Sequence, residues 1–318
     1  MGGGILETVR ATRAASDEAL LVHGRRWLGR MLRHGVTTIE AKSGYGLDTG
    51  TELRLLRVAG ALGAEGPIEI VPTFLGAHAV APEFRGRADA VEAYLDSVVT
   101  EQLFAIAEQG IARFCDVFCE EGVFDAVQSR RVLEAGAALG LRPRLHADEL
   151  RPSGGAELAA SMGAASADHL ATPSAAGIAA LGAAADAGRP VVATLLPATT
   201  FSLMSTHYAP ARALIERGVP VALGSDFNPG TSPTPNLQLV LSIACLQLKL
   251  SPAEALVATT INAARALALE ATHGSIEPGK QADLVVWDVP SVDQLPYWLG
   301  ADLVRAVIKR GEVVLSVP

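Results

Sequence analysis

Short apolar runs alternate with longer helical stretches through most of the chain, and this alternation constrains the fold more than any other feature. The runs show the two-residue period or the continuous apolar character that is typical of strands. They lie at 37–43, 68–77, 112–120, 142–146, 165–170, 190–196 and 219–226. The helical stretches between them lie at 51–62, 88–108, 126–139, 155–162, 174–187 and 210–217. The alternation predicts an α/β fold, with a parallel sheet and crossover helices.

Seven strands in this order favour one α/β architecture, a (β/α)8 TIM-like barrel that is missing its first strand. The alternative is an open doubly wound sheet. That fold typically carries a Gly-rich phosphate loop after a strand, and no such loop follows any of the seven runs. We therefore expect a barrel-type domain over residues 1–270 that is incomplete at its N-terminus.

The N-terminal region begins unusually. Met1 is followed by three glycines, and a helical pattern then runs from Ile5 to His34 and ends at Gly35. The glycines indicate either a frayed end or a chain that begins within a fold.

The C-terminal region has a different pattern from the alternating middle. Helices are expected at 236–247, 252–259 and 262–268. Short strands follow at 282–288 and within 304–315, with a hairpin turn at 309–312. This pattern predicts the remnant of a small β domain over residues 271–318.

The bulk composition excludes several classes of protein. The net charge is −8 over 318 residues, and no dense basic block is present, so nucleic acid is not an expected partner. No apolar run reaches the roughly 18 residues that a membrane helix needs, and no targeting segment is apparent. The three cysteines indicate a reducing compartment, the cytoplasm. Cys115 and Cys119 are expected to be small buried hydrophobic residues.

Polar residues gather at the predicted strand ends, where the functional residues of a barrel lie. In the stretch 142–150, a short strand ends at His146, and Glu149 follows three residues later. An imidazole beside a carboxylate suits a metal ligand beside an acid–base group, although a lone histidine is more often structural. Three of the seven histidines, His78, His146 and His169, end three different strands. The pattern predicts that three imidazoles meet at one rim of the barrel.

The last predicted strand ends at Asp226, after small residues along one face. A carboxylate at the rim can bind a metal and accept a proton from its water. The alternative interpretation is an aspartate that caps the following turn, because Asp-x-Asn-Pro-Gly is turn chemistry. The presence of His146 and His169 favours the catalytic interpretation.

The sequence leaves the interpretation of two further polar features open. Glu40 and Lys42 share one face of the first predicted strand, and they form a buried charge pair if that face points inward. His207 lies in a stretch without a helical pattern after the predicted strand at 190–196. A substrate loop is one interpretation of that stretch, and an ordinary surface loop is the other.

Seven segments, spread along nearly the whole length of the chain, carry telling motifs. They are GGGILETVRATRAAS (2–16), TTIEAKSGYGLD (37–48), TFLGAHAVAPEFRGR (73–87), RLHADEL (144–150), SADHL (166–170), SDFNPGTSP (225–233) and GSIEPGKQADLVVWD (274–288). Together they resemble the amidohydrolase superfamily and, within it, the imidazolonepropionase family. The last motif is shared by many amidohydrolases, whereas SGYG, GAHAVAPE and HADE are much narrower.

The resemblance implies a metal-dependent hydrolase of histidine degradation. A water activated by Zn²⁺ or Fe attacks the ring carbonyl of 4-imidazolone-5-propanoate, and the C–N bond opens to give N-formimidoyl-L-glutamate. By resemblance, the metal ligands are His146 and Asp226, and the catalytic residues are Glu149, His169 and Asp226. The substrate-binding residues implied are Tyr45, His78, Glu149, Asn228, Gly230 and Thr231. The family also implies a homodimer that acts on a small molecule.

The sequence departs from the family in one respect. The family carries a His-x-His pair at the end of the first barrel strand, and this sequence contains none. Because catalytic zinc sites usually offer three protein ligands, we expect this polypeptide to lack part of the metal site, as a chain incomplete at its N-terminus would. Two alternatives stay open. One is another amidohydrolase, such as a nucleobase deaminase, and the other is a non-catalytic barrel that serves as a scaffold or binding protein.

Overall fold

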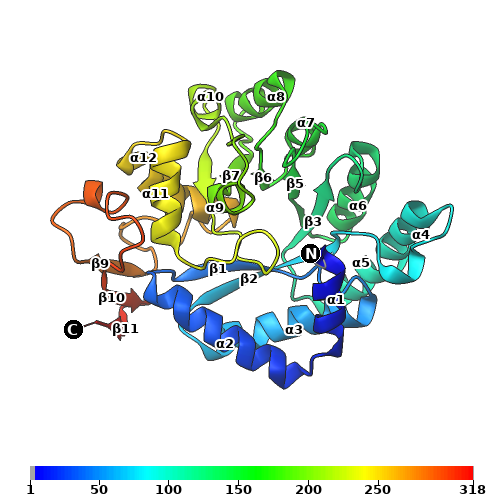
Figure 1. Cartoon of the computed structure of the whole chain (residues 1–318), viewed down its shortest axis with the longest axis horizontal. Coiled ribbons are helices and arrows are strands. Elements are labelled where there is room, and N and C mark those ends of the chain that lie inside the picture. Colours follow the sequence, from blue (N-terminus) through cyan, green and yellow to red (C-terminus); the bar gives the residue numbers. More distant parts are fainter. Residues whose placement is uncertain (1–3, 318) are drawn as a thin grey trace.

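The computed structural model describes residues 4–317. At its centre is a curved parallel sheet with helices over its outer face (Figure 1). The strand order is β1-β2-β3-β5-β6-β7-β8, and a short strand, β4, also pairs with β3. The bounds are β1 (Thr38–Lys42), β2 (Glu69–Ala77), β3 (Phe114–Cys119), β4 (Arg142–Pro143), β5 (Leu145–Ala147), β6 (Ser166–His169), β7 (Val192–Leu195) and β8 (Val221–Leu223). The seven predicted strands are confirmed, the fourth as two pieces on either side of Arg144.

The helices between the strands lie where the periodicity predicts them. Their bounds are α3 (Thr49–Glu65), α4 (Ala90–Ser97), α5 (Leu103–Gln109), α6 (Ala126–Ala138), α7 (Gly155–Met162), α8 (Ala175–Asp186) and α10 (Ala211–Glu216). Several of these helices begin at an N-cap residue: Asp48, Asp125 and Ser174 each accept a hydrogen bond from a backbone N–H of the first turn. A π-helical turn, Val98–Gln102, joins α4 and α5 within the stretch that was predicted as one helix.

The core lies between the sheet and its outer helices. In β3, Phe114, Cys115, Val117 and Cys119 are all buried. Burial on both faces is usual in parallel sheets and explains why these strands are continuous apolar runs in the sequence. Cys115 and Cys119 are free thiols in the main core, which confirms their expected role as small buried residues.

The curved sheet does not close into a full barrel. Among residues 4–317, no backbone pairing joins β8 to β1, so these two strands form the free edges of the sheet. The architecture is thus an α/β barrel type with one strand position open, as the sequence predicts. The inner face of the sheet is accessible through this opening.

Two predictions about helices were wrong in detail. The stretch 5–34 forms two helices, α1 (Gly4–Ala14) and α2 (Asp17–Arg33), because the Ser16 side chain accepts a hydrogen bond from the Ala19 N–H and starts a new helix. The glycines at positions 2 and 3 lie outside the described residues. The stretch after β7, for which no helix was predicted, contains α9 (Pro197–Ser202), with proline at the helical start that it favours.

The C-terminal region forms a second, smaller sheet. After α11 (Leu237–Gln247), α12 (Pro252–Thr259) and α13 (Ile261–Ala266) come the strands β9 (Leu284–Trp287), β10 (Val304–Lys309) and β11 (Glu312–Ser316). These strands pair antiparallel in the order β11-β10-β9, with the predicted hairpin turn between the last two. A domain boundary at residue 270 stays a prediction.

Charged side chains link the small sheet to the start of strand β2 in the larger sheet. Lys309 Nζ of β10 lies 2.6 Å from Asp283 and 3.5 Å from Glu69, which belongs to β2. His273 Nε2 lies 3.3 Å from the same Glu69 carboxylate.

In the part of the chain that the structure describes, no helix is both long and apolar enough to span a membrane.

Candidate active site

A large cavity of about 1770 Å³ opens on the inner side of the curved sheet. All the residues that the sequence assigned to the site line this cavity: Tyr45, His78, His146, Glu149, His169, Asp226, Asn228, Gly230 and Thr231. They come from the ends of strands β1, β2, β5, β6 and β8 and from the loops that follow. The rim at the carboxyl ends of the strands is where a barrel presents functional groups.

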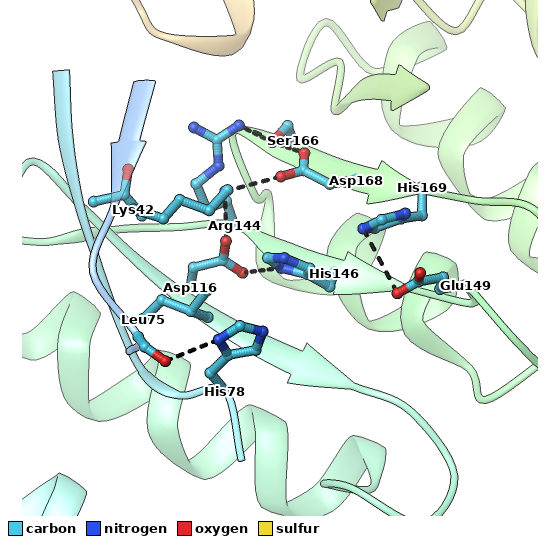
Figure 2. A network of polar contacts seen from close by, with 12 residues as sticks. Lys42, Leu75, His78, Asp116, Arg144, His146, Glu149, Ser166, Asp168 and His169 are labelled. Carbon is cyan, nitrogen blue, oxygen red and sulfur yellow. Dashed lines mark hydrogen bonds and ion pairs between the residues drawn. The ribbon is translucent and has the colours of Figure 1, made fainter. Parts of the chain in front are cut away.

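The three strand-end imidazoles meet as predicted. The ring centroid of His146 lies 5.9 Å from that of His78 and 5.3 Å from that of His169. The register of the sheet explains part of this, because Ala147 at the end of β5 is paired with His169 at the end of β6. Figure 2 shows His146 between His78, which follows the end of β2, and His169, at the end of β6.

A buried network of charges lies beneath the imidazoles, with Lys42 at its centre. Lys42 Nζ lies 2.6 Å from Asp116, 3.0 Å from Asp168 and 3.0 Å from Glu40. Burial and the nearby Arg144 lower the pKa of Lys42, but the three carboxylates outweigh both effects and the pKa is raised. The ammonium group is therefore held in its charged form. The predicted pairing of Glu40 with Lys42 is confirmed.

Arg144 completes this network from the strand break between β4 and β5. Its Nη2 donates to Ser166 Oγ at 2.6 Å, and Ser166 in turn donates to Asp168 at 2.7 Å. Arg144 Nη1 lies 2.7 Å from Glu40, as an ion pair without hydrogen-bond geometry. Two cations thus face three carboxylates inside the curved sheet, which partly offsets the cost of burying each charge.

His146 is oriented by Asp116. Its Nδ1 lies 3.1 Å from Asp116 Oδ1, so Nδ1 carries a proton that it donates to the carboxylate, and Nε2 is the other ring nitrogen (Figure 2). Burial lowers the pKa of His146, but the charge and hydrogen bond of Asp116 outweigh it and raise the pKa to about 8. A carboxylate behind an imidazole is the arrangement that metal-binding histidines adopt.

Tyr45 and His78 form the wall next to His146. Their ring centroids lie 5.3 Å apart, in an edge-on arrangement. His78 Nδ1 donates to the Gly44 carbonyl at 2.9 Å. Burial and the neighbouring His146 lower the pKa of His78 to about 4, so its imidazole is neutral at pH 7. Burial and the charge of Asp226 raise the pKa of Tyr45 to about 12, so its phenol is protonated.

Glu149 and His169 face each other on the opposite side of the site. Glu149 Oε2 lies 3.7 Å from His169 Nε2. The loop that carries Glu149 is held by the buried Glu120, which accepts the backbone N–H groups of Glu149, Leu150 and Arg151 at 2.9–3.0 Å. The backbone of His169 has a φ of 73°, a left-handed conformation that is rare outside glycine and that concentrates at functional sites.

Asp226 and the loop after β8 close the site. Asp226 Oδ2 accepts a hydrogen bond from Thr199 Oγ1 at 2.6 Å, and the Asp226 backbone has a φ of 49°. Asn228 Oδ1 accepts the N–H groups of Gly230 and Thr231, at 2.8 Å each. The alternative interpretation of Asp226 as the cap of this turn is wrong, because Asn228 accepts the backbone N–H groups of the turn while the Asp226 carboxylate lines the cavity. A catalytic role for Asp226 stays a prediction.

The part of the chain that the structure describes offers one cluster of three metal-binding side chains. Donor atoms of Asp116, His146 and Asp168 lie within 4.8 Å of one another. Lys42, however, already neutralises both aspartates at 2.6 and 3.0 Å, so we regard them as supports of the site and not as ligands. The two predicted ligands, His146 and Asp226, line the cavity, and their role as metal ligands stays a prediction. They are two protein ligands where catalytic zinc usually has three.

Sequence reasoning assigned no supporting role to three buried carboxylates of the site, Asp116, Glu52 and Glu120, although Glu120 lies at a predicted strand end. Asp116 lies within an apolar strand between two cysteines, and Glu52 and Glu120 are buried carboxylates next to the rim. A charged residue inside an apolar run is a signal that could have identified Asp116. His207 lines a separate cavity of about 50 Å³ beside Glu149 and His169, so its stretch adjoins the site.

Comparison with known proteins shows the family to which the chain belongs. The sequence profile of the amidohydrolase family matches residues 4–315. An imidazolonepropionase of Geobacillus kaustophilus is 52% identical over 315 residues, which cover 99% of this chain and 72% of that protein. An imidazolonepropionase of Alkaliphilus metalliredigens is 48% identical over 315 residues, which cover 99% of this chain and 73% of that protein.

Solved structures extend the likeness to the fold. Escherichia coli guanine deaminase superimposes with a TM-score of 0.72 at 16% identity, over 98% of this chain and 77% of that one. A zinc-bound adenosine deaminase from Xanthomonas campestris has a TM-score of 0.71 at 20% identity, over 96% of this chain and 72% of that one. At these identities the likeness concerns the fold alone. The cavity, its nine predicted residues and the close sequence relatives lead to one conclusion: the chain belongs to the imidazolonepropionase family of the amidohydrolases.

Proposed function

We propose that this chain hydrolyses the cyclic amide C–N bond of 4-imidazolone-5-propanoate to give N-formimidoyl-L-glutamate in histidine degradation. The observation that carries the proposal is that all nine predicted site residues line one cavity in a chain about half identical to imidazolonepropionases. The small-molecule substrate would enter between the rim loops. Free cysteines suit a reducing compartment, so we also propose a cytoplasmic location.

The donor groups of the site fit a divalent metal. His146 has its Nδ1 bound to Asp116 and its Nε2 available, and Asp226 contributes a carboxylate to the same cavity. We assign these two residues as protein ligands of Zn²⁺ or Fe. When bound, the metal lowers the pKa of a water molecule to near neutrality.

The remaining steps use the side chains of this chain. Asp226 accepts a proton from the attacking water, whose oxygen forms a bond to the ring carbonyl carbon. His169 stabilises the negative charge that develops on the carbonyl oxygen. Glu149 holds the ring, takes over the proton that Asp226 accepted from the water, and delivers it to the ring nitrogen as the C–N bond breaks. The water thus supplies both the new oxygen and the proton on the leaving nitrogen, and both carboxylates return to their starting state.

Binding of the substrate falls to the opposite wall and the last loop. Tyr45, protonated because its pKa is raised to about 12, donates a hydrogen bond. Neutral His78 presents Nε2 as an acceptor, because its Nδ1 is used by the Gly44 carbonyl. Asn228, Gly230 and Thr231 surround the propanoate tail. A homodimer stays a prediction.

The proposal is tested with the purified 318-residue chain. Metal content is measured by elemental analysis, and turnover of imidazolone propanoate is followed by absorbance with and without added Zn²⁺ or Fe²⁺. Because only two ligands are available, we expect less than one metal per chain as purified and turnover that rises with added metal. Asp226→Asn should lower kcat by about 10²- to 10⁴-fold, while Asp186→Asn, on the exposed end of α8, should leave it unchanged.

Two outcomes would point elsewhere. A folded chain that takes up neither metal nor the analogue 3-(imidazol-4-yl)propanoate would favour the non-catalytic scaffold. Turnover that is equal in wild type and Asp226→Asn would contradict the assigned role of that carboxylate.

A further inference from the structure

Glu52 is a buried carboxylate that the proposed reaction does not use. It lies on α3 with none of its surface exposed. Its Oε2 accepts the Gly44 N–H at 2.8 Å, and its Oε1 accepts the Gly46 and Leu47 N–H groups, also at 2.8 Å. One side chain thus binds three backbone amides of the loop that follows β1.

The loop leaves no room for a side chain at either glycine. Gly44 has a φ of 91°, and a Cβ there would lie 2.8 Å from the Leu75 carbonyl oxygen. A Cβ on Gly46 would lie 2.7 Å from the side chain of Thr51. Both glycines are therefore required for the loop to reach the Glu52 carboxylate.

The held loop carries two residues of the site wall. Tyr45 lies between the two glycines whose N–H groups bind Glu52. The carbonyl oxygen of Gly44, directly before Tyr45 in the chain, accepts a hydrogen bond from His78 Nδ1 at 2.9 Å. Because a carbonyl can only accept, this contact fixes the proton of neutral His78 on Nδ1 and leaves Nε2 unprotonated toward the cavity.

We propose that Glu52 is a positioning residue: by holding Gly44, Gly46 and Leu47, it sets the place of Tyr45 and the tautomer of His78. The consequence for the reaction rests on the proposed function, because Tyr45 and His78 are there the substrate-binding wall. Glu52 itself does not line the cavity and acts through the loop.

The energetics argue against a role in stability alone. Burial raises the pKa of Glu52, and the hydrogen bonds from the loop lower it by less, so the net pKa is raised. The folded protein therefore holds this carboxylate at a cost. An apolar side chain would fill the same space without that cost, but it could not orient three amides.

The first test reads the tautomer of His78 directly by ¹⁵N NMR of the imidazole nitrogens at pH 7.5, with the signals assigned by comparison with His78→Gln. We expect a single tautomer with the proton on Nδ1 in the wild-type chain. In Glu52→Gln, one of the two acceptor oxygens is replaced by an NH₂ group, so the side chain can no longer hold all three loop N–H groups. The Gly44 carbonyl is then free to move away from His78, and we expect a mixture of His78 tautomers. A wild-type tautomer with the proton on Nε2, or an unchanged tautomer in a folded Glu52→Gln chain, would overturn the proposal.

Two further variants keep the test decisive. Glu52→Asp retains the charge but is one methylene shorter, and it should give an intermediate tautomer ratio if Glu52→Gln does not fold. Glu254→Gln is the matched control, because Glu254 also accepts a backbone N–H at 2.8 Å, from Ser251 at the start of α12, and neither residue lines the cavity. That variant should keep the wild-type tautomer, and a shifted tautomer there would contradict a specific role for Glu52.

The second readout is functional. In Glu52→Gln, kcat/KM should fall at least about tenfold and up to about 100-fold, as small misplacements of binding groups do. The Kd for 3-(imidazol-4-yl)propanoate, measured by calorimetry, should rise by a similar factor. The tautomer does not depend on turnover, so a chain without activity would refute the proposed function and still allow the role of Glu52 to be judged.

Discussion

Asp116 Oδ1 lies 3.1 Å from His146 Nδ1, while Asp116 Oδ2 lies 2.6 Å from Lys42 Nζ. One buried carboxylate thus orients the imidazole assigned to the metal and binds the central cation of the inner network. The two contacts use different oxygens, so each can be tested separately.

Asp116→Asn should weaken metal binding by about 10- to 100-fold, because the partner behind a metal-binding imidazole fixes its tautomer and raises its basicity. The measurement is a competitive Zn²⁺ titration against a chromophoric chelator. Asp186→Asn serves as the control, since it removes an exposed carboxylate with the same change of atoms. Equal metal affinity in Asp116→Asn and wild type would show that Asp116 does not support the metal.

Lys42→Met should destabilise the fold by about 3 kcal/mol, because it leaves buried carboxylates without their cation. Asp116 and Asp168 are both almost fully buried, so each depends on the nearby ammonium group to compensate its charge. Urea unfolding gives the free energy of unfolding. Lys249→Met, at an exposed position, should change it by less than about 0.5 kcal/mol; a similarly small loss in Lys42→Met would contradict the prediction.

Glu120→Gln should loosen the loop that carries Glu149. The carboxylate accepts three successive N–H groups, from Glu149 to Arg151, and a glutamine cannot accept with both ends. Loss of such bonds costs about 1–3 kcal/mol, so exchange of these amides should accelerate by roughly 10- to 100-fold. Hydrogen–deuterium exchange with mass spectrometry reports this change. Asp125→Ala, which removes the side-chain cap of α6, should accelerate exchange only in that helix.

The Glu69 cluster should make stability fall in acid. Burial raises the pKa of Glu69, but the hydrogen bond from Gln281 and the charges of Lys309 and His273 outweigh it and lower the pKa to about 2. A carboxyl whose pKa is lower in the folded chain stabilises the fold above its unfolded pKa, and this contribution is lost as the pH falls from about 5 to 2.

The expected loss is on the order of 2 kcal/mol, read from urea unfolding at a series of pH values. Glu69→Gln should flatten that part of the profile, whereas Glu121→Gln, at an exposed ion pair, should not. An identical slope in the Glu69→Gln chain would place the acid sensitivity elsewhere.

The strands, the open barrel and the residues of the rim could all be predicted from the amino-acid sequence. Each depends on local information, because a run of apolar residues marks a strand and a polar residue at its end marks the rim. A parallel sheet then brings all such ends to one side, so His78, His146 and His169 could be expected to meet before any contact was known.

The groups that support these residues could not be predicted before the packing of the elements was known. Lys42 and Asp168 are 126 positions apart, and Asp116 and His146 are 30 apart, so no local pattern pairs them. The loops that hold Tyr45 and Glu149 likewise depend on Glu52 and Glu120, whose side chains bind backbone amides and leave no periodic signal. The physical reason is that periodicity reports which face of an element is buried, whereas a hydrogen bond between elements exists only once their packing has placed donor and acceptor within about 3 Å.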